Sequence, residues 1–124
     1  MDADNAMAQA PHRQAAREAL AEVGRAPFQL IHYAQVVKPL PMLFQRHGLG
    51  QLLAYLQLRG DGKPTSPYQL LARQLDRWLL TTLAVSARTA LAALSARDSR
   101  FYREASEQAW LFLRALREGL EEPR

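Results

Sequence analysis

Cysteine is absent from this chain of 124 residues. Its absence excludes disulfides, thiolate nucleophiles and cysteine-ligated zinc or iron–sulfur sites, so nothing requires an oxidising compartment and the cytoplasm is the expected location. Long apolar runs are also lacking, since stretches such as Trp78 to Val85 fall far short of a bilayer span. Residues 1–10 lack the apolar segment of a signal peptide. We therefore expect neither export nor a membrane partner.

Recognisable catalytic and metal-binding clusters are missing as well. The three histidines, His12, His32 and His47, lie on different segments, and none has a second histidine or a carboxylate at the i+3 or i+4 spacing of helical metal sites. The Gly-Leu-Gly stretch at 48–50 lacks the preceding strand and the Lys-Ser/Thr pair of a phosphate-binding loop. We therefore predict that the protein is not an enzyme and has no catalytic residue, metal site, cofactor or small-molecule substrate.

Strands are scarcely indicated, because no segment alternates apolar and polar residues and because leucine and alanine dominate the apolar content. The pattern that is present is helical. Glycine and proline mark the breaks, and the stretch 60–66 is the expected exposed loop. We expect helical segments near 9–26, 28–37, 42–47 and 49–59, a long one from 67 to beyond 83, and two more near 86–94 and 98–120. The sequence thus predicts one all-α domain over residues 1–124, a compact bundle of about five to six helices, with residues 1–8 flexible.

The helical spacing also predicts which side chains are buried. The segment at 28–37 is expected to bury Phe28 and Ile31, and the segment at 86–94 includes Ala87 on its apolar side. The long helix at 67–83 should turn Gln69, Arg73, Asp76 and Arg77 outward. Its expected buried face carries Tyr68, Leu71, Ala72, Leu75, Trp78, Leu79 and Leu83. The expected buried face of the last helix carries Phe101, Tyr102, Ala105, Ala109, Phe112, Leu116 and Leu120.

Trp110 falls on the opposite arc of the last helix, among charged residues that include Arg114. Large aromatic side chains are enriched at protein interfaces and can also stack on nucleic-acid bases. We expect Trp110 and Arg114 to contact another protein, and a contact with nucleic acid is the less favoured interpretation.

Basic charge is concentrated in the middle of the chain. Residues 1–26 and 98–124 each carry a net charge of −1, whereas residues 27–97 hold eight basic residues against two acids, a local charge of +6. Such an excess is typical of a surface that binds a polyanion, although basic faces also keep proteins soluble. Only two of the sixteen basic residues are lysine. Arginine suits phosphate because its planar guanidinium can donate two parallel hydrogen bonds, but an arginine-rich source would explain this preference equally well.

The segment from Lys38 to Leu56 has a recognisable order: a basic residue, a proline, a few apolar residues, Gly48-Leu49, and then an Ala-Tyr-Leu run at 54–56. In this order and spacing the chain resembles the small-subunit family of Cmr-type (type III-B) CRISPR effector complexes. The resemblance covers roughly residues 13–120. It departs from the family at His47, where asparagine is more frequent, and in residues 1–10. Further matching positions are Tyr68, Leu75, Trp78 to Leu80, Tyr102-Arg103, Ala109, Leu113 and Leu116-Arg117.

The resemblance implies a non-catalytic helical subunit that stacks in a few copies along a ribonucleoprotein, beside other Cmr-type subunits. It also implies that the subunit supports guide RNA and bound target RNA through their backbones. The basic middle of the chain agrees with this role, because phosphate contacts give affinity without reading sequence. The side chains that we predict to face phosphate are Arg17, Lys38, Arg46, Arg59, Arg73 and Arg77.

Three other functions compete with this interpretation. A helix-turn-helix DNA regulator would need polar, base-reading side chains on its second helix, and residues 49–56 are too apolar for that. A protein-only adaptor would use its arginines for solubility alone, and its assembly would survive nuclease treatment. A small hydrolase is the weakest alternative, because no catalytic cluster is recognisable.

Overall fold

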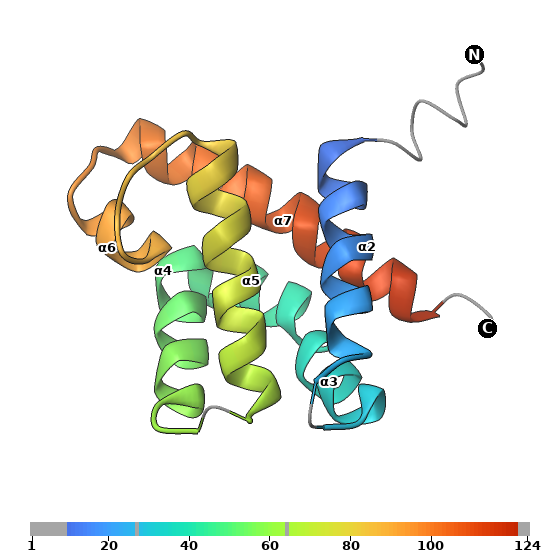
Figure 1. Ribbon diagram of the computed structural model, residues 1–124. Helices are drawn as coiled ribbons and strands as arrows, with labels where there is room; N and C mark the ends of the chain where they lie inside the picture. Colours follow the sequence, from blue (N-terminus) through green and yellow to red (C-terminus); the bar gives the residue numbers. More distant parts are fainter. Residues whose placement is uncertain (1–9, 27, 64, 122–124) are drawn as a thin grey trace, which may run out of the picture.

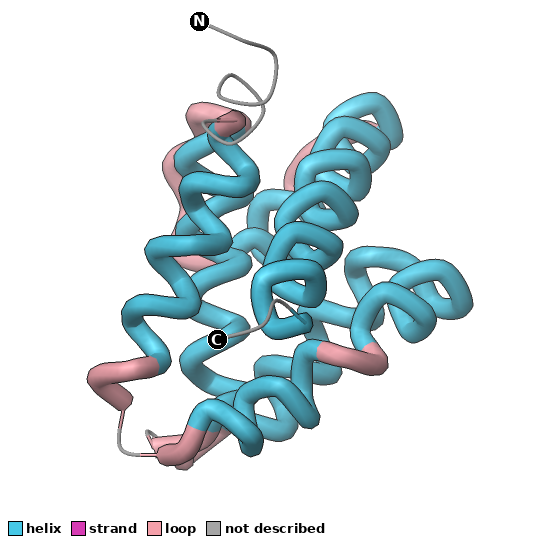
Figure 2. Tube along the Cα trace, turned by 90° about the vertical axis from the view of Figure 1, so that its right-hand side faces the viewer, coloured by secondary structure: helices cyan, strands magenta, loops and turns pink. Residues whose placement is uncertain are grey.

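The computed structural model describes residues 10–26, 28–63 and 65–121, so the predicted flexibility of residues 1–8 lies outside the described residues. Every regular element in this described part is a helix (Figure 2), which confirms the predicted all-α class and the number of helices. The six helices are α2 (Pro11–Val23), α3 (Leu30–Val37), α4 (Leu40–Gly60), α5 (Pro67–Thr82), α6 (Ala90–Ser95) and α7 (Ser99–Glu121). None of them is long and apolar enough to cross a membrane.

The longest helix, α7, organises the bundle. It crosses behind α5 and α2, while the second half of α4 stands beside α5 and α6 covers the end next to them (Figure 1). The core is dominated by leucine and alanine, as in α7, where Ala105, Ala109, Phe112 and Leu116 are each no more than 1% exposed. Burying one face of every longer helix against its neighbours is what holds such a bundle together, because isolated helices of this length are marginal in water.

Side-chain caps fix where three helices begin. Ser66 accepts a hydrogen bond from the backbone N–H of Tyr68 at 3.1 Å, directly before the first-turn proline of α5. Asp98 accepts one from the N–H of Phe101 at 3.0 Å and caps α7 as predicted. Thr89 caps α6 in the same way. The predicted helix at 86–94 is therefore too long at its start, and Ala87 is exposed instead of buried.

The two segments predicted at 42–47 and 49–59 form one kinked helix, α4. The kink is at Gly48, whose φ of 82° and ψ of 171° are not helical. A residue with a Cβ rarely adopts this φ, so only glycine fits there without strain. Tyr102 closes the kink, because its hydroxyl accepts a hydrogen bond from the N–H of Gly50 at 3.0 Å. The predicted burial of Tyr102 is wrong: the residue is 37% exposed, and its hydroxyl caps the second half of α4.

The predicted buried face of the segment at 28–37 is wrong at Ile31, whereas Phe28, which precedes α3, is partly buried against the core. Ile31 is 59% exposed, and the side chains that α3 buries are Tyr33, Val36 and Val37. Periodicity could not decide this, because apolar residues occur all around so short a helix. Tyr33 decides it, since its hydroxyl donates to the buried Gln74 of α5 at 2.5 Å.

Asp76 of α5 is half-buried, against the prediction that it points outward. Its Oδ1 accepts a hydrogen bond from the N–H of Ala90 at 2.9 Å and so ties α5 to the start of α6. Trp78 packs against the core as predicted, but only half-buried. Its ring stacks on Phe112 at a centroid distance of 5.8 Å, and its Nε1 donates to the carbonyl of Gln108 at 2.9 Å.

Candidate nucleic-acid interface

All six side chains predicted to face phosphate are exposed. They come from several elements, since Arg17 lies on α2, Lys38 directly follows α3, Arg46 and Arg59 lie on α4, and Arg73 and Arg77 lie on α5. Arg73 and Arg77 are one helical turn apart on the same side of α5. Arg46 and Arg59 are not neighbours, because most of the second half of α4 separates them.

Ion pairing is concentrated at the ends of the chain, although Arg17, Arg25 and Arg103 there have no carboxylate within 4 Å among the described residues. Within the described residues, Arg13, Arg100, Arg114 and Arg117 of the two terminal helices each have a glutamate oxygen within 4 Å. In the middle of the chain only Arg77 has such a partner there, Glu22 of α2 at 3.5 Å. The other basic side chains of the middle segment therefore keep a charge that no carboxylate of the described structure neutralises at contact distance.

The pair at Glu22 belongs to a polar cluster that joins α2 to α5. Gln74 donates to Glu22 Oε1 at 2.9 Å, and Arg77 donates to Glu22 Oε2 at 3.5 Å. Burial acts to raise the pKa of Glu22, but the hydrogen bond from Gln74 and the charge of Arg77 outweigh it and hold the pKa below its ordinary value. The charge of Arg73 acts in the same direction. Arg77 thus already has a carboxylate partner within the fold, whereas Arg73 has none within 4 Å among the described residues.

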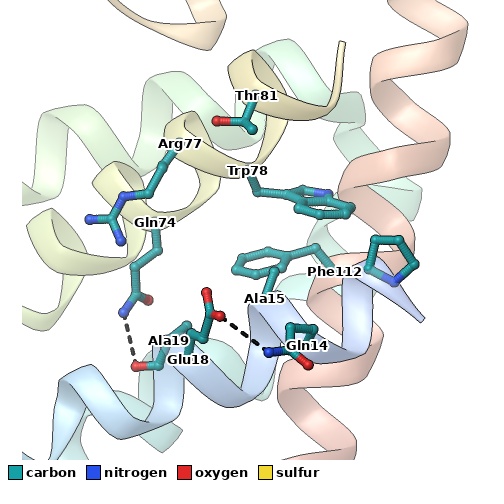
Figure 3. Close-up of a pocket in the computed structure, with 10 residues that line it drawn as sticks. Gln14, Ala15, Glu18, Ala19, Gln74, Arg77, Trp78, Thr81 and Phe112 are labelled. Atoms are coloured by element: carbon teal, nitrogen blue, oxygen red, sulfur yellow. Dashed lines mark hydrogen bonds between the residues drawn. The ribbon is translucent and has the colours of Figure 1, made fainter. Parts of the chain in front are cut away.

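Next to this cluster, α2 and α5 enclose a mostly apolar groove of about 370 Å³ (Figure 3). The stacked rings of Trp78 and Phe112 line it, and Arg77 stands at its edge. Gln14 and Glu18 of α2 face the groove and are hydrogen-bonded to each other at 3.4 Å. Among the described residues, no group of three or more His, Cys, Asp or Glu side chains could hold a metal ion.

A second polar cluster lies where α4 ends and α5 begins. The guanidinium of Arg59 is 5.0 Å from the ring centroid of Tyr68 and 5.8 Å from that of Tyr55, and its Nη2 donates to the Tyr68 hydroxyl at 3.3 Å. This hydrogen bond lowers the pKa of the Tyr68 hydroxyl below its ordinary value. Lys63 lines the same hollow as Arg59 and Tyr68. The exposure of Tyr55 was not predicted, because its place in an apolar run does not show which side of the helix is covered.

Trp110 is half-buried, whereas its helical phase predicted a solvent-facing ring. It packs on Phe44 of α4 in a tilted arrangement, with the ring centroids 5.8 Å apart. The position of Trp110 on the helical wheel was misleading, because the wheel does not show that α4 packs against this side of α7. Arg114 is exposed, with its guanidinium 5.8 Å from the Trp110 ring and 3.7 Å from Glu118. The protein contact expected of Trp110 and Arg114 stays a prediction.

The model of the CRISPR-associated protein family Cas_Cmr5 matches residues 9–118. The chain belongs to this family. Cmr5 membership confirms the resemblance seen between Lys38 and Leu56 and makes the protein a small subunit of a Cmr-type (type III-B) CRISPR effector complex, where it associates with other Cmr subunits. Small subunits of the Cmr5 family are non-catalytic. No curated protein and no solved structure gives a significant match to the chain.

Proposed function

We propose that this Cmr5 family member supports guide RNA and target RNA in the type III-B effector through contacts with their phosphate backbones, in antiviral defence. One observation carries the proposal. Seven of the eight exposed cations of the middle segment, all but Arg77, have no carboxylate at contact distance in the described structure, against three of the seven described cations outside it, Arg17, Arg25 and Arg103. Charges that the fold leaves unpaired are available to a polyanion.

Phosphate contacts suit a subunit that must accept guides of any sequence. A cation that replaces the counterions of a phosphate adds affinity without reading a base. Arginine adds direction to this charge, because its planar fork meets two phosphate oxygens at once. Arg46 and Arg73 are the candidates we test, because they are the two exposed arginines of the predicted set in the middle segment that make neither an ion pair nor a side-chain hydrogen bond among the described residues.

The test compares two double variants with the same change of charge. Arg46→Gln with Arg73→Gln removes unpaired cations, and Arg100→Gln with Arg117→Gln removes cations that α7 pairs with Glu104 and Glu121. Binding of the full chain to a labelled guide–target RNA duplex is measured over a salt titration. We expect the first variant to reduce the slope of log K against log salt by about 2, one unit for each lost contact, and the second to leave it nearly unchanged. Equal slopes in both variants would exclude Arg46 and Arg73 from the RNA contact.

We also propose that several copies of the protein stack along the RNA and contact other Cmr subunits through exposed apolar side chains. Ile31, Met42 and Leu58 are 59%, 53% and 78% exposed, which leaves apolar area available for a partner. Nuclease treatment of the native assembly distinguishes the roles. Loss of the protein from the assembly supports RNA-dependent placement, and full retention favours the protein-only adaptor.

A further inference from the structure

Tyr55, Arg59 and Tyr68 form a compact cluster at the junction of α4 and α5. The two tyrosine rings meet edge to face, with centroids 6.0 Å apart at an angle of 82°. Arg59 is held against both rings and by its hydrogen bond to the Tyr68 hydroxyl. Tyr55 nevertheless remains 38% exposed. The cluster therefore presents an aromatic face and a guanidinium that are already ordered before anything binds.

Two hollows flank the cluster. One, of about 510 Å³, is lined by Arg59, Tyr68 and Lys63 together with the hydroxyl-bearing side chains Thr65 and Ser66, and its volume lies in the usual range of ligand sites. The other, of about 130 Å³, lies along α4 and is lined by Leu43, His47, Gln51, Leu52 and Tyr55. Tyr55 thus lines the smaller, more apolar hollow, and Arg59, whose guanidinium lies 5.8 Å from the Tyr55 ring centroid, lines the cationic one.

We propose that this cluster binds one unpaired nucleotide of RNA, with the base stacked on Tyr55 and the adjoining phosphate contacted by Arg59 and Lys63. The inference rests on the proposed function and adds a site that reads whether a nucleotide is unpaired. A base held in a duplex cannot reach the Tyr55 ring, because both of its faces are already stacked on neighbouring bases. Stacking on an aromatic side chain is tolerant of sequence, since every base has a π face.

The charges around the cluster favour RNA over a protein partner. Arg59 has no carboxylate within 4 Å among the described residues, and Lys63 adds a second cation to the same hollow. Asp61 is the one acid between them in the sequence, so the turn keeps a net positive charge. An aromatic ring beside unpaired cations is the arrangement that single-stranded nucleic acids use, with the base on the ring and the backbone on the cations.

The experiment uses the full chain and a single-stranded oligoribouridylate that carries one 5-iodouridine, which crosslinks to an aromatic side chain stacked on it. Irradiation and peptide mapping are expected to place the crosslink on Tyr55. Tyr55→Ala should weaken binding of the single strand roughly five-fold or more, while Tyr55→Phe, which keeps the ring, should bind as the parent does. The matched control is Leu111→Ala, which trims a side chain of the same 38% exposure on α7.

Other outcomes overturn the site. The site is wrong if Tyr55→Ala binds the single strand as well as Leu111→Ala does, if it weakens a fully paired duplex equally, or if the crosslink maps elsewhere. Loss of companion subunits from the nuclease-treated assembly of Tyr55→Ala would assign the cluster to a protein contact instead. The proposed function fails separately, because its test rests on Arg46 and Arg73. A normal salt response of their double variant, combined with a Tyr55 crosslink, would remove the phosphate contacts of Arg46 and Arg73 and keep the nucleotide site.

Discussion

Gln74 of α5 donates a hydrogen bond to the backbone carbonyl of Ala19 in α2 at 3.1 Å, and it does so at only 3% exposure. The same amide nitrogen donates to Glu22, and the amide oxygen accepts from the Tyr33 hydroxyl of α3. One buried side chain therefore joins three helices. Buried polar groups with full sets of partners favour a single packing arrangement, because any shift leaves a partner unsatisfied. In this protein the arrangement fixes α2 against α5, beside Arg73 and Arg77.

Gln74→Ala is expected to lower the free energy of unfolding by about 2–4 kcal/mol, because the buried Tyr33 hydroxyl and the Ala19 carbonyl lose their partner. Gln57→Ala is the control, since Gln57 is exposed on α4 and its loss should change stability by about 0.5 kcal/mol or less. Urea unfolding followed by circular dichroism measures both. A Gln74 variant as stable as the Gln57 variant would mean that the three-helix junction is unimportant to the fold.

Two glycines of α4 should respond to alanine with opposite signs. Gly48→Ala is expected to destabilise the protein by about 1–3 kcal/mol, because φ at this position is 82° and the new Cβ would lie 3.0 Å from the Tyr102 hydroxyl. Gly50→Ala should stabilise it by about 0.5–1 kcal/mol, since its Cβ would meet Tyr102 only at an ordinary 3.7 Å and alanine favours helix. Thermal unfolding of the two variants provides the comparison, and the same sign for both would contradict the kink.

The sequence predicted the helices well where capping residues and periodicity act together. Ser66 before Pro67 and Asp98 before the last helix mark starts that the structure keeps, and the predicted core positions Ala105, Ala109, Phe112 and Leu116 of α7 are buried. The sequence was less informative in α3, which carries apolar residues on all its sides. It was also less informative before α6, which begins only after the cap at Thr89. Local patterns define a helix, but its buried side depends on which neighbours cover it.

The candidate site was predicted only in part, for the same reason. Helical phase predicted the exposure of Arg73 and Arg77, but the ion pair of Arg77 with Glu22 depends on how α2 packs against α5, which spacing along the chain cannot reveal. The Tyr55 cluster likewise needs α4 and α5 to meet. Gln74 had a usable signal, because a polar residue among Leu71, Leu75 and Trp78 on an apolar face indicates a buried hydrogen-bonding role.

The stability of the protein should respond to pH through Asp76 and Glu22 with opposite signs. Burial raises the pKa of Asp76 above its ordinary value, although the Ala90 N–H opposes this. A carboxyl with a raised pKa binds more protons in the folded state than in the unfolded state. Its contribution to the stability of the folded protein is therefore greatest below the unfolded pKa, about 3.9, and is lost as pH rises through the folded pKa. Glu22, whose pKa is lowered, stabilises above the unfolded value and loses this as pH falls through the folded pKa.

Neutral variants isolate the two contributions. Relative to the parent, Asp76→Asn should become progressively more stable as pH rises from about 3 to about 7, because the parent then carries a half-buried charge. Glu22→Gln should become progressively less stable over the same range, because the parent gains the charged contact with Arg77. Urea unfolding at several pH values gives both differences. Parallel pH profiles for the two variants would contradict the assigned pKa directions.

Arg114 allows the expected protein contact on α7 to be tested without disturbing the core. It is exposed and its ion pair with Glu118 is a surface pair, so Arg114→Glu should change the free energy of unfolding by about 1 kcal/mol or less. The ring of Trp110, packed on Phe44, should stay in place. Arg117→Glu is the matched control, because Arg117 lies on the same helix and is paired in the same way with Glu121.

If Trp110 and Arg114 meet a neighbouring subunit, Arg114→Glu should reduce co-purification of companion Cmr subunits, and Arg117→Glu should not. A negative charge in place of Arg114, beside the Trp110 ring, would repel the surface of the neighbouring subunit that the positive charge of Arg114 attracts. The comparison is quantitative when both variants unfold at the same urea concentration as the parent. Equal recovery of companion subunits with the two variants would place the contact elsewhere and leave Trp110 with a packing role on Phe44 alone.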